Sequence, residues 1–234
     1  MIYFKHILII LASFSLVCSV QGQNNEAKLR FEAVFGEENS EALTSLVNLF
    51  ELSLKTKYSN NIDVAYRFYL TEIESGKSPA IWHKEEKHKW VRKYLVDTEV
   101  WNEIWLKADS VWMEGNECCC KYRYNDFARE TRSFSLSGDT VCSCEVLPNK
   151  YGLYFDALRV ASQFDENVRD YLEAVEIAGV ISPSVLASGL SSENTKYYHE
   201  YFAKRFILLG IYLRGIGLNK KPLFLQRTVS EYFS

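Results

Sequence analysis

The chain has 234 residues, of which 47% are apolar, 24% charged and 15% aromatic, with only 4 prolines and 11 glycines. These proportions exclude a disordered, collagen-like or low-complexity protein and are typical of a globular protein with ample material for a core. Lysine and arginine number 27 against 30 aspartates and glutamates, so the net charge is −3 and no overall basic field indicates nucleic acid as a partner. The length allows one domain or two small ones.

The start of the chain, residues 1–22, has the pattern of a secretory signal peptide. A short basic start precedes a 14-residue uncharged run (residues 7–20), and small or aliphatic side chains stand one and three residues before Gln23. The run is too short to span a bilayer comfortably, and no later segment is long enough. An uncleaved membrane anchor and a lipid-modified Cys18 are the alternatives to cleavage.

We therefore expect an exported protein whose mature chain does not span the membrane. The sequence contains no Asn-x-Ser/Thr sequon, which favours a bacterial envelope or secreted protein over a eukaryotic glycoprotein. The expected location is the bacterial periplasm, the outer surface or the medium.

Apolar residues repeat at helical spacing through the first half of the mature chain. They predict one helix over residues 40–57 and a second that begins after residues 60–61 and ends near Gly76. Ser78-Pro79 predicts the start of a third helix, because proline at the first helical position loses only an N–H that has no partner there. Short connections favour antiparallel neighbours.

The second half continues in the same style. An apolar stripe over residues 157–175 predicts one helix, or two if Asp165 caps the second. Ser182-Pro183 opens a short turn or helix. A last long helix is expected over residues 193–214, and Gly215 stops it.

The pattern changes in the middle of the chain. Side chains over residues 112–124 alternate with period two, and residues 137–140 predict a turn before a second alternating segment, residues 141–146. We therefore predict a mainly α, helical bundle-like single domain over residues 23–234. It carries a small antiparallel β hairpin or sheet insertion near residues 110–147.

Five cysteines remain once the signal peptide has been removed, in two clusters: Cys118, Cys119, Cys120, Cys142 and Cys144. Disulfides are the default in an exported protein. If both clusters lie on strands, the outer two cysteines of the first cluster share a face, and so do the two of the second. Two bridges between the clusters are then possible if these strands are neighbours, with Cys119 left over or pairing between chains.

The same paired thiolates could instead bind Zn²⁺ or Cu(I), with the ligands Cys118, Cys120, Cys142 and Cys144. Cys-x-Cys is a less common half-site for structural zinc than the wider two-residue spacing, and export favours oxidation. No cofactor is therefore expected, and a thiolate metal-handling protein is the alternative.

All five tryptophans lie between residues 82 and 112. On a continuous helix, four aromatic side chains would share one side: Trp90, Tyr94, Trp101 and Trp105. Such a stripe suits a platform for a sugar ring or a peptide, and it equally suits core packing. Core packing is the preferred interpretation, and ligand binding is the alternative.

The segment from His83 to His88 places two histidines and two carboxylates close together. The histidines are five residues apart, about 140° around a helix, whereas a helical zinc pair needs a spacing of four. Surrounding lysines indicate a solvated charged face. A hydrolase that uses Glu85, Glu86 or His88 among scattered site residues is the second alternative, since no catalytic motif is present.

The leading hypothesis is an exported, non-enzymatic α-helical binding module in which disulfides staple the β insertion. Its ligand is expected to be a protein or a saccharide, because the chain is rich in aromatic residues and contains no catalytic motif.

Overall fold

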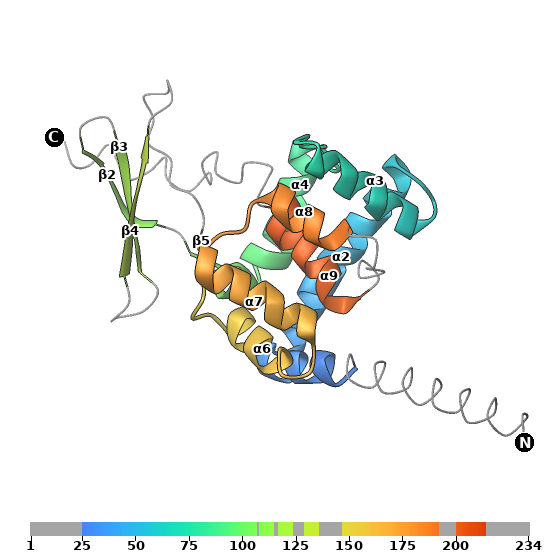
Figure 1. The fold of residues 1–234 in the computed structure, drawn as a ribbon, viewed down its shortest axis with the longest axis horizontal. Coiled ribbons are helices and arrows are strands. Elements are labelled where there is room, and N and C mark those ends of the chain that lie inside the picture. Colours follow the sequence, from blue (N-terminus) through green and yellow to red (C-terminus); the bar gives the residue numbers. More distant parts are fainter. Residues whose placement is uncertain are drawn as a thin grey trace, which may run out of the picture.

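The structure is a computed structural model that describes residues 25–106, 108–114, 117–123, 129–135, 147–191 and 200–213. The expected signal peptide and the second cysteine cluster lie outside these residues. Figure 1 shows a body of helices and, beside it, a small sheet. The prediction of a mainly helical chain with a small antiparallel β insertion is confirmed.

The helical elements lie on both sides of the β insertion in the sequence. They are residues 25–35, α2 (Glu37–Lys57), α3 (Ile62–Glu74), α4 (Lys84–Val91), the π-helix η1 (Arg92–Val96), α5 (Val100–Ile104), α6 (Leu153–Ala161), α7 (Glu166–Ala178), α8 (Pro183–Ser191), α9 (Tyr201–Phe206) and the π-helix η3 (Ile207–Leu213).

Side-chain caps account for two of the helix starts that the sequence predicts. The Asn61 side chain accepts hydrogen bonds from the backbone N–H groups of the second and third residues of α3, at 3.0 and 3.3 Å. Asp165 caps α7 in the same way, at 2.9 and 3.3 Å, so the stripe over residues 157–175 forms two helices rather than one. α8 begins at Pro183, as predicted.

The helix start predicted at Ser78-Pro79 is wrong, because α4 begins only at Lys84. The backbone between these points serves a tertiary contact instead. The N–H of Trp82 donates to the hydroxyl of Tyr212 at 2.8 Å, so this segment is tied to η3 before α4 starts.

The last helix also differs from the prediction. α9 begins at Tyr201, with Glu200 as its N-cap, and residues 193–199 and Gly215 lie outside the described residues. After Phe206 the helix continues as η3, in which every residue is buried. The period of 3.6 that reveals an amphipathic helix gives no indication of a π-helix that is buried on all sides.

Three strands form an antiparallel sheet in the order β2-β3-β4: β2 (Ala108–Glu114), β3 (Glu117–Arg123) and β4 (Arg129–Ser135). The alternating run over residues 112–124 is therefore two paired strands rather than one, because alternation continues on both sides of the reversal. The sequence analysis missed β4. Residues 137–146, where a turn and a strand were expected, lie outside the described part of the chain.

A short two-stranded ladder connects this insertion to the helical body. β1 (Trp105–Leu106) pairs with β5 (Leu147–Pro148), with Trp105 opposite Pro148. In Figure 1 the three-stranded sheet stands to one side of the helices. The chain thus leaves the helical body at β1 and returns to it at β5.

The core of the helical body is rich in aromatic rings. Phe50 of α2 is fully buried, and its ring centroid lies 4.8 Å from that of Tyr212, 5.5 Å from that of Tyr69 and 6.0 Å from that of Trp82. These rings come from α2, α3, η3 and the segment before α4. The cluster therefore joins elements that are far apart in the sequence.

Lys87 of α4 is a cation within this core. It is 3% exposed, and its ammonium lies 5.1 Å from the ring centroid of Tyr212. Burial lowers the pKa of Lys87 from 10.5 to about 8, because desolvation disfavours the charged form.

Stability is therefore expected to rise with pH between about 8 and 9, because the unfolded chain keeps a proton on Lys87 that the folded protein has released. Toward pH 10 an opposite effect reduces this rise, because burial raises the pKa of Tyr69 and of other core tyrosines, and the unfolded chain then loses tyrosine protons that the folded protein keeps. Urea unfolding at pH 7, 8, 9 and 10 measures the rise. Lys87→Met should abolish it and be more stable at pH 7, whereas the exposed Lys89→Met should retain it; an unchanged rise in Lys87→Met would contradict the assignment.

Candidate functional site

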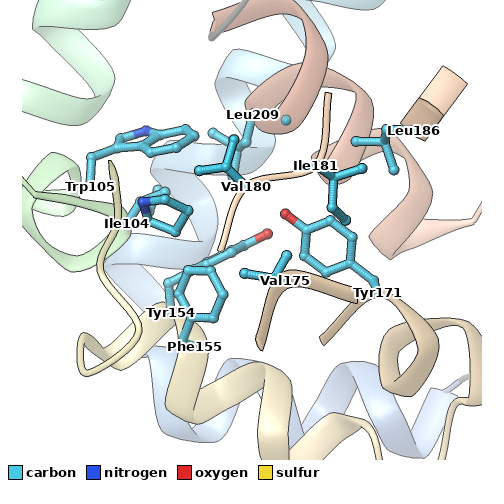
Figure 2. Close-up of a pocket in the computed structure, with 12 residues that line it drawn as sticks. Ile104, Trp105, Tyr154, Phe155, Tyr171, Val175, Val180, Ile181, Leu186 and Leu209 are labelled. Carbon is cyan, nitrogen blue, oxygen red and sulfur yellow. The ribbon is translucent and has the colours of Figure 1, made fainter. Parts of the chain in front are cut away.

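A small, mainly apolar pocket lies where α6, α7 and η3 meet the β1–β5 ladder (Figure 2). Its deep side is formed by buried side chains: Ile104, Trp105, Phe155, Val175 and Leu209. Its outer side is formed by half-buried side chains: Tyr171, Val180, Ile181 and Leu186. The pocket therefore faces solvent at the connection between α7 and α8, and we call it the tyrosine pocket after Tyr154 and Tyr171.

The free space in the tyrosine pocket is about 20 Å³, which is room for one water-sized group. Gly210 of η3 helps to keep this space open. A Cβ at position 210 would lie 2.7 Å from Cδ2 of Leu186 and 4.0 Å from the hydroxyl of Tyr171. A side chain at this position would therefore press on the pocket wall.

Tyr154 brings an unsatisfied polar group to this pocket. It is 2% exposed, and its hydroxyl has no hydrogen-bond partner among the described residues. Figure 2 shows the hydroxyls of Tyr154 and Tyr171 turned toward each other inside the pocket. A buried hydroxyl without a partner costs about 1–3 kcal/mol, so the arrangement is incomplete without an added hydrogen-bonding group.

The electrostatics keep this hydroxyl neutral. Desolvation by burial raises the pKa of Tyr154 well above 10, and the nearby Tyr171 raises it further, while the charge of Arg205 opposes both effects. None of the described residues that line the pocket carries a formal charge at pH 7. The tyrosine pocket can therefore donate hydrogen bonds to an oxygen atom in apolar surroundings.

No pattern in the sequence distinguishes this site. Tyr171 and Val175 belong to the predicted apolar stripe, but a stripe does not show where a hydroxyl points. Tyr154 lies before that stripe begins. The pocket combines residues from Ile104 to Gly210, and only the tertiary structure brings them together.

The four aromatic residues predicted as a platform separate into two pairs. Trp101 and Trp105 are each 7% exposed, with their ring centroids 6.2 Å apart, so they belong to the core. The helix is not continuous, because Glu99 has a positive φ of 61° before α5 begins. Trp105 is the one member that also lines the tyrosine pocket.

Trp90 and Tyr94 form the second pair, on α4 and η1. Both are half-buried and their rings stack at 6.3 Å. The ammonium groups of Lys89 and Lys93 lie 4.8 Å from the centroids of Trp90 and Tyr94, respectively. Lysine ammonium groups therefore already contact these two rings. The use of Trp90 and Tyr94 as a ligand surface stays a prediction.

The first cysteine cluster lies on the central strand β3. Cys119 and Cys120 are buried; Cys119 is a thiol and Cys120 is disulfide-bonded. No disulfide joins these two residues to each other, and they are the cysteines whose side chains the structure describes. The predicted pairing and the alternative thiolate metal site both stay predictions.

β3 is bonded to β2 on one side and to β4 on the other. The pairing between the two cysteine clusters stays a prediction, because Cys142 and Cys144 lie outside the described residues. Bridges from the first cluster would have to leave the sheet through one of its faces.

The histidine and glutamate segment lies at the start of α4. His83 lies before α4 as its N-cap, and its backbone N–H donates to the Glu86 carboxylate at 3.4 Å. Glu85 and His88 are exposed on α4. Across the described ranges, no group of three or more His, Cys, Asp or Glu side chains could hold a metal ion.

No protein-family model, curated protein or solved structure matches this chain. Of the helices that the structure describes, none combines the length and the apolar character needed to cross a membrane.

Proposed function

We propose that this chain is an exported, non-enzymatic binding module whose tyrosine pocket takes the oxygen-bearing end of a small, mainly apolar ligand. The observation that carries the proposal is the buried Tyr154 hydroxyl, which has no partner among the described residues and points into an apolar pocket. A ligand oxygen supplies the missing acceptor. The pattern over residues 1–22 supports the proposal of export.

The walls restrict the kind of ligand. A space of about 20 Å³ admits one small polar group, so the body of the ligand lies against the half-buried rim of Ile181 and Leu186. The hydroxyls of an inserted sugar ring would lack partners among these apolar side chains. An aryl or alkyl group with a terminal oxygen fits better, whether it is a free compound or a side chain of a partner protein.

A matched pair of probes tests this proposal. Acetophenone and α-methylstyrene have nearly the same shape, but only acetophenone has an oxygen acceptor. In NMR titrations, acetophenone is expected to bind about tenfold more tightly than α-methylstyrene, which corresponds to one hydrogen bond to a buried donor. Equal affinities, or no saturable binding of either probe, would refute the proposal.

Two variants test whether the affinity difference between the two probes arises in the tyrosine pocket. Tyr154→Phe should bind the two probes equally, whereas Gly210→Ala should weaken both because its methyl group occupies space near Leu186 and Tyr171. Chemical-shift changes confined to other parts of the molecule would place the probe elsewhere and so contradict the proposal.

Stability gives an independent prediction for the unliganded protein. Tyr154→Phe should leave the free energy of unfolding unchanged or raise it by about 1 kcal/mol, because it removes a buried hydroxyl that has no partner. Tyr66→Phe is the matched control. It should lose about 1 kcal/mol, since the Tyr66 hydroxyl bonds to Glu51 at 3.1 Å. A comparable loss in Tyr154→Phe would indicate that a permanently bound water satisfies this hydroxyl.

Intact mass spectrometry tests the export and the disulfide staple. Protein recovered from a cell envelope or medium should begin at Gln23 and gain mass on reduction and alkylation as disulfides open. A full-length chain, or five alkylatable thiols before reduction, would refute this part of the proposal.

A further inference from the structure

Arg205 of α9 is a buried cation close to the tyrosine pocket. It is 2% exposed, and its guanidinium carbon lies 3.3 Å from the ring centroid of Tyr201. Its terminal nitrogens donate to the carbonyl oxygen of Tyr201 at 2.9 Å and to the hydroxyl of Thr44 at 2.7 Å. Its Nε has no hydrogen-bond partner among the described residues.

Arg205 forms no ion pair with the residues that the structure describes. Among the described residues, no carboxylate lies within 4.0 Å of its guanidinium. The charge of Glu32 raises the pKa of Arg205 against the effect of burial. The Glu32 carboxylate lies 4.0 Å from the ammonium of Lys28. A buried guanidinium without a close counter-ion is unusual, because the cost of desolvating the charge is normally offset by a paired anion.

Two ring contacts connect Arg205 and its neighbours to the two tyrosines of the pocket. The next residue, Phe206, stacks on Tyr171 with ring centroids 3.8 Å apart. Phe31 contacts both Tyr154 and Tyr201, with centroids 5.7 and 5.9 Å apart. The Arg205 charge also acts on Tyr154, whose pKa it lowers against the effect of burial.

We infer that the ligand of the tyrosine pocket is an anion, and specifically a carboxylate, held by the Tyr154 hydroxyl and favoured by the positive charge of Arg205. This inference rests on the proposed function. The pocket offers the Tyr154 hydroxyl as a donor and no charged lining among its described residues, and the buried cation Arg205 acts on that hydroxyl. In such a weakly polar environment a positive charge strengthens a hydrogen bond to a carboxylate and opposes a cationic ligand.

Three probes of one shape measure the sign of the preferred charge: benzoate, benzamide and benzamidinium. NMR titrations of the intact wild-type protein at pH 7 and low salt should give affinities in that order, with benzoate about tenfold tighter than benzamide. The preference should shrink only weakly with added salt, because a buried charge is poorly screened. Equal affinities, or tighter binding of benzamidinium, would overturn the inference.

The outcome separates this inference from the proposed function. Acetophenone binding combined with no preference among the charged probes would refute the anion and retain the binding pocket. Failure of acetophenone as well as of benzoate, benzamide and benzamidinium would refute both.

Variants on α9 assign the preference to one residue. Arg205→Gln should reduce benzoate affinity to that of benzamide and leave acetophenone affinity unchanged. Arg205→Lys keeps the charge and should retain most of the preference, so it serves as the second variant where the glutamine variant folds poorly. Lys204→Gln is the matched control; its ammonium pairs with Glu51 at 2.7 Å, and its loss should not alter benzoate binding.

Discussion

Replacing Phe50 by alanine is expected to lower the free energy of unfolding by about 3–5 kcal/mol. Phe50 is fully buried and contacts rings from three other parts of the chain, including Trp82 and Tyr212. Truncation removes apolar burial and also leaves a cavity among stiff aromatic neighbours, which cannot collapse into it as aliphatic chains can. Urea denaturation monitored by tryptophan fluorescence measures the loss.

Phe68→Ala is the matched control for this prediction. Phe68 is 55% exposed on α3, and its ring stacks on that of Tyr58 at 6.5 Å. The same chemical truncation should therefore cost less than about 1 kcal/mol. Similar losses in the two variants would mean that the ring cluster around Phe50 does not form the core described above.

Gly152→Ala is expected to destabilise the protein by about 1–3 kcal/mol, through overpacking rather than cavity formation. Gly152 has an ordinary backbone conformation before α6, so the restriction is one of space. A Cβ at position 152 would overlap the carbonyl oxygen of Glu103 and come within 2.8 Å of the Asn149 side-chain nitrogen. Backbone atoms cannot move aside as the end of a side chain can, so α5 and α6 must separate.

Gly189→Ala provides the opposite outcome at a matched position. Gly189 lies inside α8, and no described atom would lie within 4 Å of its new Cβ. Alanine should raise stability here by about 0.5–1 kcal/mol, because glycine is the poorer helix former. Thermal melts of the two variants should therefore shift in opposite directions, and a neutral Gly152→Ala would contradict the close approach of α5 and α6.

The sequence predicts the helices well where the signal is local. The stripe on α2, the Asn61 cap of α3 and the Asp165 cap of α7 each depend on residues within a few positions of one another. Such information is sufficient for element type and for several boundaries. It fails at Ser78-Pro79, where a tertiary hydrogen bond to Tyr212 determines the backbone path.

Two other predictions failed because a local pattern does not show where a strand or a helix is interrupted. Period-two alternation over residues 112–124 is identical for one long strand and for two strands that reverse and pair, so the hairpin within this run is invisible to it. The aromatic platform assumed an uninterrupted helix, and the positive φ of Glu99 breaks it. A pattern gives the periodicity of a segment but not its continuity.

The candidate site was not predictable by these means. Its donor, Tyr154, is one of 15 tyrosines, and nothing in its local sequence distinguishes it. Among the tyrosines it is set apart by a hydroxyl that lacks a partner among the described residues and lies in the pocket, and by the electrostatic effect of Arg205 from far along the chain. A local pattern contains information about neither property.

The β1–β5 ladder makes the central insertion a replaceable part of this protein. Because Trp105 lies opposite Pro148, both ends of the excursion over residues 107–146 are already fixed side by side. The entropy of closing a loop grows only slowly with its length, so the helical body is indifferent to how much chain is attached there. Evolution could lengthen, shorten or exchange that attachment with little effect on the helices, and a protein engineer could graft another hairpin at the same two strands.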